Sequence, residues 1–375
     1  MGLSGCPDFF VLKVSSTTCG SFGMKTACLA AAFSLSILTI LHAQGNGYHD
    51  PSPQRYQIEE RASVIDPRAR AHPEIEFFLE KGGKPADIQH ASVDTRVAPQ
   101  GKLVIWLMAH NGTLFEKINS YGYHAIQVHY ANGWFGKLYG NQPPADDLFL
   151  SKVRLEAATG KDFSDAVHIP EPDGMMERAF QFVSWLSKKH PQGQWHGFLT
   201  PDRKGLRWDR VIMSGASHGS TTAARFAKYQ KVDRVVMFSG PRDQLEVWQK
   251  LPSATPENRY FGFTHTLDEG WKNDHYCRSW ELLGMNAFGA VTDVDQAKPP
   301  YGNTRRLITS ADVKNNAGRA HSCSVPGGAA VKDAKGRYLH EDVWRYLFTH
   351  PVDQVGAADA HDSSCTIEHR SPVKR

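Results

Sequence analysis

The sequence predicts an α/β protein with a mostly parallel central sheet and helices on both faces of that sheet. From about residue 91, short apolar runs of strand length alternate with stretches of helical periodicity, which is typical of repeated strand–helix units. The run at 102–108 (KLVIWLM) is apolar from its second residue onward, as expected of a central strand that is buried on both faces. A hydrophobic fraction of 41% in 375 residues is ordinary for a globular protein with a full core.

The expected elements follow one another between residues 91 and 350, which we expect to form the main domain. Strands are expected at six apolar runs: 102–108, 125–130, 210–213, 234–238, 260–264 and 306–309. Helices are expected at three stretches: 174–190, which Pro191 ends, 218–230 and 343–348. The long stretch 132–172 contains Gly, Pro and Asp, so it is expected to form a loop or a lid beside a site.

Two polar segments flank this domain. Residues 44–90 are rich in Pro, Gln, Arg and His and show little sustained periodicity, so we expect a loosely ordered lead-in. Residues 351–375 form a polar tail that we expect to be disordered. His361, Cys365 and His369 are spaced four apart in this tail, but a polar terminal segment favours surface side chains over a metal site.

The N-terminal region, residues 1–43, contains the pattern of a secretory signal peptide at 24–43. Lys25 precedes a short apolar run at 27–41, and Ala43 supplies the small residue at which such peptides are cleaved. The run is shorter than the ~20 residues that cross a bilayer, so no membrane span is expected in the mature protein. We expect cleavage after about Ala43 and a secreted or periplasmic product; a buried or membrane-anchoring N-terminal helix is the alternative.

Charge and motifs argue against several partners. The formal net charge is +4, and no dense basic run is interleaved with aromatic residues, which disfavours a nucleic-acid partner. No phosphate-binding or dinucleotide-binding fingerprint follows a predicted strand, so neither a cofactor nor a bound metal is expected.

A candidate nucleophile lies in the segment 215–219 (GASHG), which fits the pattern G-x-S-x-G. The apolar strand at 211–213 precedes it and a helix of small residues follows, which is the strand–turn–helix context that such a turn needs. Glycines are required because the turn is sharp and its backbone comes close to neighbouring chain. The turn would lift the hydroxyl of Ser217 above the edge of the sheet, so Ser217 is the predicted nucleophile.

With these residues the chain, from about 98 to 350, resembles the α/β-hydrolase superfamily. The segments 215–220, 238–241 (FSGP) and 262–265 (GFTH) together resemble a little-characterised group of secreted bacterial α/β-hydrolases. The resemblance implies an α/β-hydrolase fold and a chain order of serine, then acid, then histidine.

The general base is expected to be His321. A serine hydroxyl is a poor nucleophile until a histidine removes its proton. His321 follows the last predicted strand by a polar loop, where the resemblance places the base. His265 and His275 are the alternatives, although both come early for the expected order.

The acid that orients the base is expected to be Asp268. It follows the strand at 260–264, where the resemblance places the carboxylate. Asp243, after the strand ending at Phe238, matches an acid position that some hydrolases use. Asp274 is the third candidate.

The oxyanion hole requires two backbone N–H groups. His218 is expected to supply one. The other is expected from the loop after 102–108, where His110 or Asn111 departs from the His-Gly-Gly pattern of many lipases and esterases.

A disulfide between Cys277 and Cys323 is a further prediction, because it would join the loop of the acid to that of the base. Cys365 would then be the unpaired thiol of the mature chain.

The sequence therefore predicts a secreted serine hydrolase of the carboxylesterase or lipase type. Its substrate is expected to be a small-molecule or polymer ester, cleaved through an acyl-enzyme on Ser217. A peptidase or thioesterase with the same triad is an alternative, and so is a binding protein of this fold whose triad is inactive.

Overall fold

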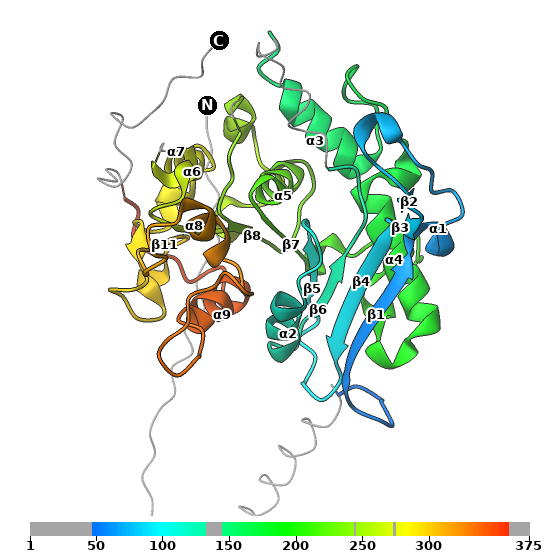
Figure 1. Cartoon of the computed structure of the whole chain (residues 1–375), viewed down its shortest axis with the longest axis horizontal. Coiled ribbons are helices and arrows are strands. Elements are labelled where there is room, and N and C mark those ends of the chain that lie inside the picture. Colours follow the sequence, from blue (N-terminus) through cyan, green and yellow to red (C-terminus); the bar gives the residue numbers. More distant parts are fainter. Residues whose placement is uncertain (1–46, 133–144, 244, 273–274, 360–375) are drawn as a thin grey trace, which may run out of the picture. The chain divides into compact units, whose positions relative to one another are not determined.

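The computed structural model describes residues 47–132, 145–243, 245–272 and 275–359 (Figure 1). The predicted signal peptide, part of the predicted lid, Asp274 and the histidines and cysteine of the C-terminal tail lie outside these residues. In the part of the chain that is described, no helix is both long and apolar enough to cross a bilayer.

A nine-stranded sheet organises the described chain (Figure 1). Its strands in spatial order are β1 (Arg55–Arg61), β4 (Ile88–Asp94), β6 (His124–Gln127), β5 (Leu103–Trp106), β7 (Val211–Ala216), β8 (Arg234–Phe238), β9 (Tyr260–His265), β11 (Arg306–Thr309) and β10 (Thr292–Asp293). β4 pairs antiparallel with both β1 and β6, and the pairings from β6 through to β10 are parallel. The predicted mostly parallel sheet is confirmed.

Successive side chains of the central strands enter two separate cores, because neighbouring residues of a strand point to opposite faces. In β5, Leu103 and Ile105 belong to one apolar cluster, and Val104 and Trp106 belong to the other. The first cluster includes residues of α4 (Met175–Lys189) and α5 (His218–Tyr229). The second includes residues of α2 (Gly112–Ser120) and α9 (Glu341–Thr349). Helices therefore cover both faces, as predicted.

The remaining helices and strands complete the described chain. The helices are α1 (Ala62–Ile65), α3 (Phe149–Thr159), α6 (Glu269–Lys272), α7 (His275–Leu282) and α8 (Ala317–Cys323). The strands β2 (Glu80–Lys81) and β3 (Lys84–Pro85) form a separate two-stranded hairpin.

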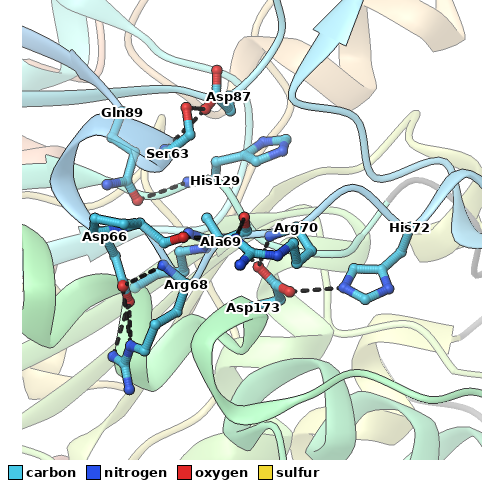
Figure 2. Close-up of polar contacts among 12 residues, drawn as sticks. Ser63, Asp66, Arg68, Ala69, Arg70, His72, Asp87, Gln89, His129 and Asp173 are labelled. Atoms are coloured by element: carbon cyan, nitrogen blue, oxygen red, sulfur yellow. Dashed lines mark hydrogen bonds and ion pairs between the residues drawn. The ribbon is translucent and has the colours of Figure 1, made fainter.

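The predicted loosely ordered lead-in is wrong for much of residues 44–90, because this segment contains β1 and α1. In β1 only Ile58 is fully buried, since this polar strand lies at the edge of the sheet, so its sequence shows little apolar alternation. Hydrogen bonds also attach the residues after β1 to the rest of the domain. Asp87 accepts hydrogen bonds from Ser63, and Asp173 accepts one from the backbone of Arg70 at 3.3 Å (Figure 2).

The predicted loop or lid at 132–172 is also wrong in part, since α3 occupies Phe149–Thr159. Every residue of α3 from Leu150 to Thr159 is buried except Lys152, so the helix has no clear polar face. A helix that is buried nearly all round loses the periodicity by which amphipathic helices are found in a sequence.

Candidate active site

Ser217 lies at the turn between β7 and α5, with φ 53° and ψ −126°. An L-residue rarely adopts a positive φ, because such a conformation costs about 1–3 kcal/mol. It persists only where the surrounding structure holds the residue in place. Here the N–H of Ser217 donates to the carbonyl of Phe238 at 3.0 Å. Its carbonyl accepts hydrogen bonds from the N–H of Ser220 at 3.1 Å and from the Ser220 hydroxyl at 2.6 Å. The turn is thus held from both sides.

The two glycines of the motif are required by close backbone contacts. A Cβ on Gly215 would lie 2.4 Å from the carbonyl carbon of Gly219. A Cβ on Gly219 would lie 1.9 Å from the carbonyl oxygen of Leu107, directly after β5. Because backbone atoms cannot move aside as a side-chain end can, only glycine fits at either position. The first turn of α5 therefore packs directly on the end of β5.

Asp268 and His321 form a hydrogen-bonded pair. His321 Nδ1 lies 2.8 Å from Asp268 Oδ2, and Asp268 is only 1% exposed. The other carboxylate oxygen accepts hydrogen bonds from the N–H of Gly270 at 2.9 Å and from the hydroxyl of Tyr276 at 3.1 Å. Burial acts to raise the pKa of Asp268, but the hydrogen bond and charge of His321 and the other two hydrogen bonds outweigh it and lower that pKa. The carboxylate is therefore ionised, and both of its oxygens accept hydrogen bonds.

The same contact acts on the imidazole of His321. The hydrogen bond to Asp268 raises the pKa of His321 above its ordinary value, against the opposing effect of burial. The two residues meet because β9 and β11 are parallel neighbours: Asp268 follows the end of β9, and His321 lies in α8, which follows β11. The side chain of His321 is 39% exposed, so its ring is accessible from solvent.

Ser217 and His321 both contact the segment that follows β8. The hydroxyl of Ser239 donates to the carbonyl of His321 at 2.7 Å. A Cβ on Gly240 would lie 3.2 Å from the carbonyl oxygen of Ser217. Among the described residues the Ser217 hydroxyl makes no hydrogen bond to His321. The structure thus joins the predicted acid and base directly, and Ser239 and Gly240 contact the backbones of His321 and Ser217 respectively.

The alternative acid and bases are engaged elsewhere. Asp243 Oδ2 accepts hydrogen bonds from Arg154 Nε at 3.1 Å and from Trp248 Nε1 at 3.2 Å. Both ring nitrogens of His265 are used: Nε2 contacts the carbonyl of Ala311 at 2.8 Å, and Nδ1 accepts from a backbone N–H at 2.9 Å. Burial and two arginines lower the pKa of His275 to about 4.

The three predicted oxyanion-hole residues, His218, His110 and Asn111, differ from one another in their contacts. His218 is the first residue of α5 and so lies at the N-terminus of that helix. The ring of His110 stacks on His90 with centroids 4.0 Å apart. Asn111 caps α2: its side chain accepts from the N–H of Leu114 at 2.9 Å and donates to the carbonyl of Pro326 at 2.7 Å.

Met108, which follows β5, also contacts the elbow, and sequence reasoning missed it. The sulfur of Met108 lies 3.0 Å from the Cβ position of Gly219. The sequence shows where the strand ends but not which following residue meets the elbow, so it offers no signal for Met108.

A buried ion pair behind the elbow was also missed. Arg154 of α3 binds Asp243 and, through Nη1, also donates to the carbonyl of His218 at 3.3 Å and to the hydroxyl of Thr222 at 2.9 Å. Both charged side chains are at least 95% buried. Arg154 thus ties α3, the first residues of α5 and the segment after β8 together.

The predicted disulfide between Cys277 and Cys323 is wrong. Cys323 is a buried free thiol that packs in an apolar cluster with Val313, Ala320 and Val331, and its sulfur donates to the carbonyl of Ala320 at 3.3 Å. Burial raises the pKa of Cys323 to about 12. The pairing was predicted because Cys277 and Cys323 follow Asp268 and His321 in the sequence, but this spacing does not show in which direction either sulfur points.

Neither a protein-family model nor a curated protein matches the sequence. Solved structures similar to the chain include an esterase B from Lactobacillus rhamnosis, which is 13% identical with a TM-score of 0.31 over 74% of this chain and 82% of that one. An α/β serine hydrolase homologue from Coxiella burnetii is 14% identical, with a TM-score of 0.30 over 65% and 89%. A sugar hydrolase from Lactococcus lactis is 9% identical, with a TM-score of 0.34 over 69% and 90%.

The fold is that of the α/β-hydrolases. The strand order, the parallel sheet beyond β6 and the tight turn between β7 and α5 establish this. Within this fold the candidate site lies at the carboxyl ends of β7, β8, β9 and β11, where ligands bind in open parallel sheets.

Proposed function

We propose that the chain is a serine hydrolase that cleaves carboxylic esters through an acyl-enzyme on Ser217. The observation that carries the proposal is the hydrogen-bonded Asp268–His321 pair at the same sheet edge as the strained Ser217 turn. A serine held at positive φ beside an oriented imidazole is the arrangement that nucleophilic acyl transfer needs.

His321 acts as general base and then as general acid. Its Nδ1–H donates to Asp268, which leaves Nε2 with a free electron pair. As Ser217 Oγ attacks the ester carbonyl carbon, Nε2 takes the hydroxyl proton and then delivers it to the leaving alcohol. Water, deprotonated by the same nitrogen, attacks the acyl-enzyme; the acid is released and Ser217 recovers its proton.

The developing oxyanion requires donors that are in place before the reaction. The N–H of His218 supplies one, at the N-terminus of α5, where the helix dipole also favours negative charge. The segment after β5 supplies the other, from Met108 or from His110 or Asn111. Arg154 holds the carbonyl of His218 and so maintains the backbone of the first turn.

The substitution Ser217→Ala tests the proposal. The wild-type protein is expected to hydrolyse short 4-nitrophenyl esters, and the variant is expected to lose this turnover while keeping its thermal unfolding midpoint. The matched control is Ser310→Ala, because Ser310 is an exposed serine whose hydroxyl contacts Asp293 and Asp295 and is not proposed to react. A wild-type protein that turns over no ester, amide or thioester would support a binding protein instead.

We also propose that the protein is exported. The support is the pattern at 24–43, with a basic start, a short apolar run and Ala43. The intact mass of the product made from the full-length sequence in a secreting bacterial host tests this. A mass that begins after about Ala43 agrees with it, and a full-length cytoplasmic product contradicts it.

A further inference from the structure

Arg242 is an exposed cation at the rim of the candidate site. It belongs to the segment after β8 that contacts both Ser217 and His321 through Gly240 and Ser239. Arg242 therefore follows closely on two residues that contact the backbones of Ser217 and His321.

The backbone of Arg242 is anchored to the elbow helix. Its N–H donates to the hydroxyl oxygen of Thr221 at 3.1 Å, and the same hydroxyl donates to the carbonyl of Arg242 at 3.1 Å. Thr221 lies four residues after Ser217 in α5, and its hydroxyl is also 3.4 Å from the carbonyl of Ser217. Two hydrogen bonds thus fix the backbone of Arg242 to the helix that begins after Ser217, while its side chain is exposed.

The guanidinium of Arg242 is not occupied by a carboxylate of the described chain. Neighbouring arginines are paired: Arg154 binds Asp243 at 3.1 Å, and Arg278 binds Glu246 at 2.6 Å. Within the described residues the side chain of Arg242 makes no ion pair and no hydrogen bond.

The positive charge of Arg242 affects the pKa values of two histidines near the site. It contributes to the lowered pKa of His275, after burial, and it opposes the rise in the pKa of His321. Glu269 acts on the pKa of His321 in the opposite direction. The guanidinium charge is therefore within electrostatic range of both His275 and His321.

We propose that Arg242 binds a carboxylate on the substrate, so that the natural substrates are esters with an anionic group a few bonds from the scissile carbonyl. This inference rests on the proposed ester hydrolysis. A guanidinium presents its N–H groups in a planar fork that matches both oxygens of a carboxylate. Bound in this way, the carboxylate would hold the ester carbonyl above Ser217 at a set distance, which favours attack.

Two esters of equal acyl length test the effect of the substrate carboxylate alone: the 4-nitrophenyl monoester of glutaric acid, which has the carboxylate, and 4-nitrophenyl pentanoate, which lacks it. The wild-type protein is expected to have the higher kcat/KM for the glutarate ester. In Arg242→Gln the ratio of the two kcat/KM values is expected to fall about fivefold, mainly through KM, because an exposed charged hydrogen bond is worth little more. Arg242→Lys is expected to give an intermediate ratio, since it keeps the charge but loses the fork.

Glu269→Gln is the matched control, because it removes an exposed charge that acts on His321 with the opposite sign to that of Arg242. It is expected to raise the glutarate-to-pentanoate ratio, and added salt is expected to narrow the preference in the wild type and in Glu269→Gln, which both keep the guanidinium. Labelling of each variant with an uncharged fluorophosphonate verifies that the site has formed.

The outcomes distinguish the two proposals. Hydrolysis of pentanoate with no glutarate preference, or a ratio that Arg242→Gln leaves unchanged, overturns the carboxylate site and leaves the ester hydrolase standing. A wild-type protein that hydrolyses neither ester and resists fluorophosphonate overturns the proposed function itself.

Discussion

His321 Nδ1 lies 2.8 Å from Asp268 Oδ2, although the two residues are 53 positions apart in the chain. The contact exists because β9 and β11 are adjacent parallel strands whose following segments meet at one edge of the sheet. Asp268 makes two further hydrogen bonds there, so its carboxylate has one fixed orientation. This geometry sets the tautomer of His321, on which the proposed chemistry depends.

Asp268→Asn is expected to lower kcat by about 10³–10⁴-fold with little change in KM, because an amide can donate to Nδ1 and so favours the wrong tautomer. Steady-state kinetics on 4-nitrophenyl butyrate measure this. Asp243→Asn is the comparison, since Asp243 binds Arg154 rather than His321. Equal losses in kcat in the two variants would contradict the assignment of Asp268 as the orienting acid.

The pH dependence of kcat/KM follows from the raised pKa of His321. The proposed mechanism needs the neutral imidazole, so activity is expected to fall as the pH drops through that pKa, which lies above 6.5. Replacing Asp268 by alanine removes the main cause of the rise and is expected to move the acidic limb to lower pH. An acidic limb that stays in place in Asp268→Ala would show that another group controls it.

Gly219→Ala is expected to lower the free energy of unfolding by about 1–3 kcal/mol and to reduce activity, since the new methyl would overlap the carbonyl of Leu107. Urea unfolding and ester turnover check the two effects. Gly328→Ala is the control, because nothing lies within 4 Å of the corresponding Cβ position. Full stability and activity in Gly219→Ala would mean that the elbow does not pack as described.

Arg154→Met is expected to cost about 3–5 kcal/mol, because it leaves the carboxylate of Asp243 buried without its cation. The double variant Arg154→Met/Asp243→Asn removes both charges and is expected to recover part of this loss. Urea unfolding of both variants measures the coupling. Equal stability of the single and double variants would argue against a buried ion pair.

Cys323 is expected to resist alkylation by iodoacetamide in the folded protein, because burial raises its pKa to about 12 and so removes the reactive thiolate. Mass spectrometry of tryptic peptides after native and denaturing alkylation tests this. Modification of Cys323 under native conditions, or its recovery in a disulfide, would contradict the structure.

The sequence predicted the parts of the site that depend on local pattern and chain order. The elbow is visible because its glycines are demanded by contacts within the motif and with the next strand, at Gly215 and Gly219. Asp268 and His321 could be chosen because each follows a predicted strand, and parallel strands end at one edge.

What the sequence could not predict depends on burial that leaves no periodic signal. α3 is buried nearly all round, so its residues look like a loop and the role of Arg154 is invisible. β1 is an edge strand with a single fully buried residue, Ile58, so it reads as a polar lead-in. The state of Cys323 depends on the direction of one side chain, which spacing along the chain does not encode.

The central claim is that Ser217 forms the covalent intermediate, and adduct mapping tests it most directly. The wild-type protein is treated with an alkyl fluorophosphonate, digested and analysed by tandem mass spectrometry. The account predicts one adduct, on Ser217, that is absent from Ser217→Ala and strongly reduced when His321 is replaced by alanine. An adduct on a different residue, or none in a folded protein that still hydrolyses esters, would contradict it.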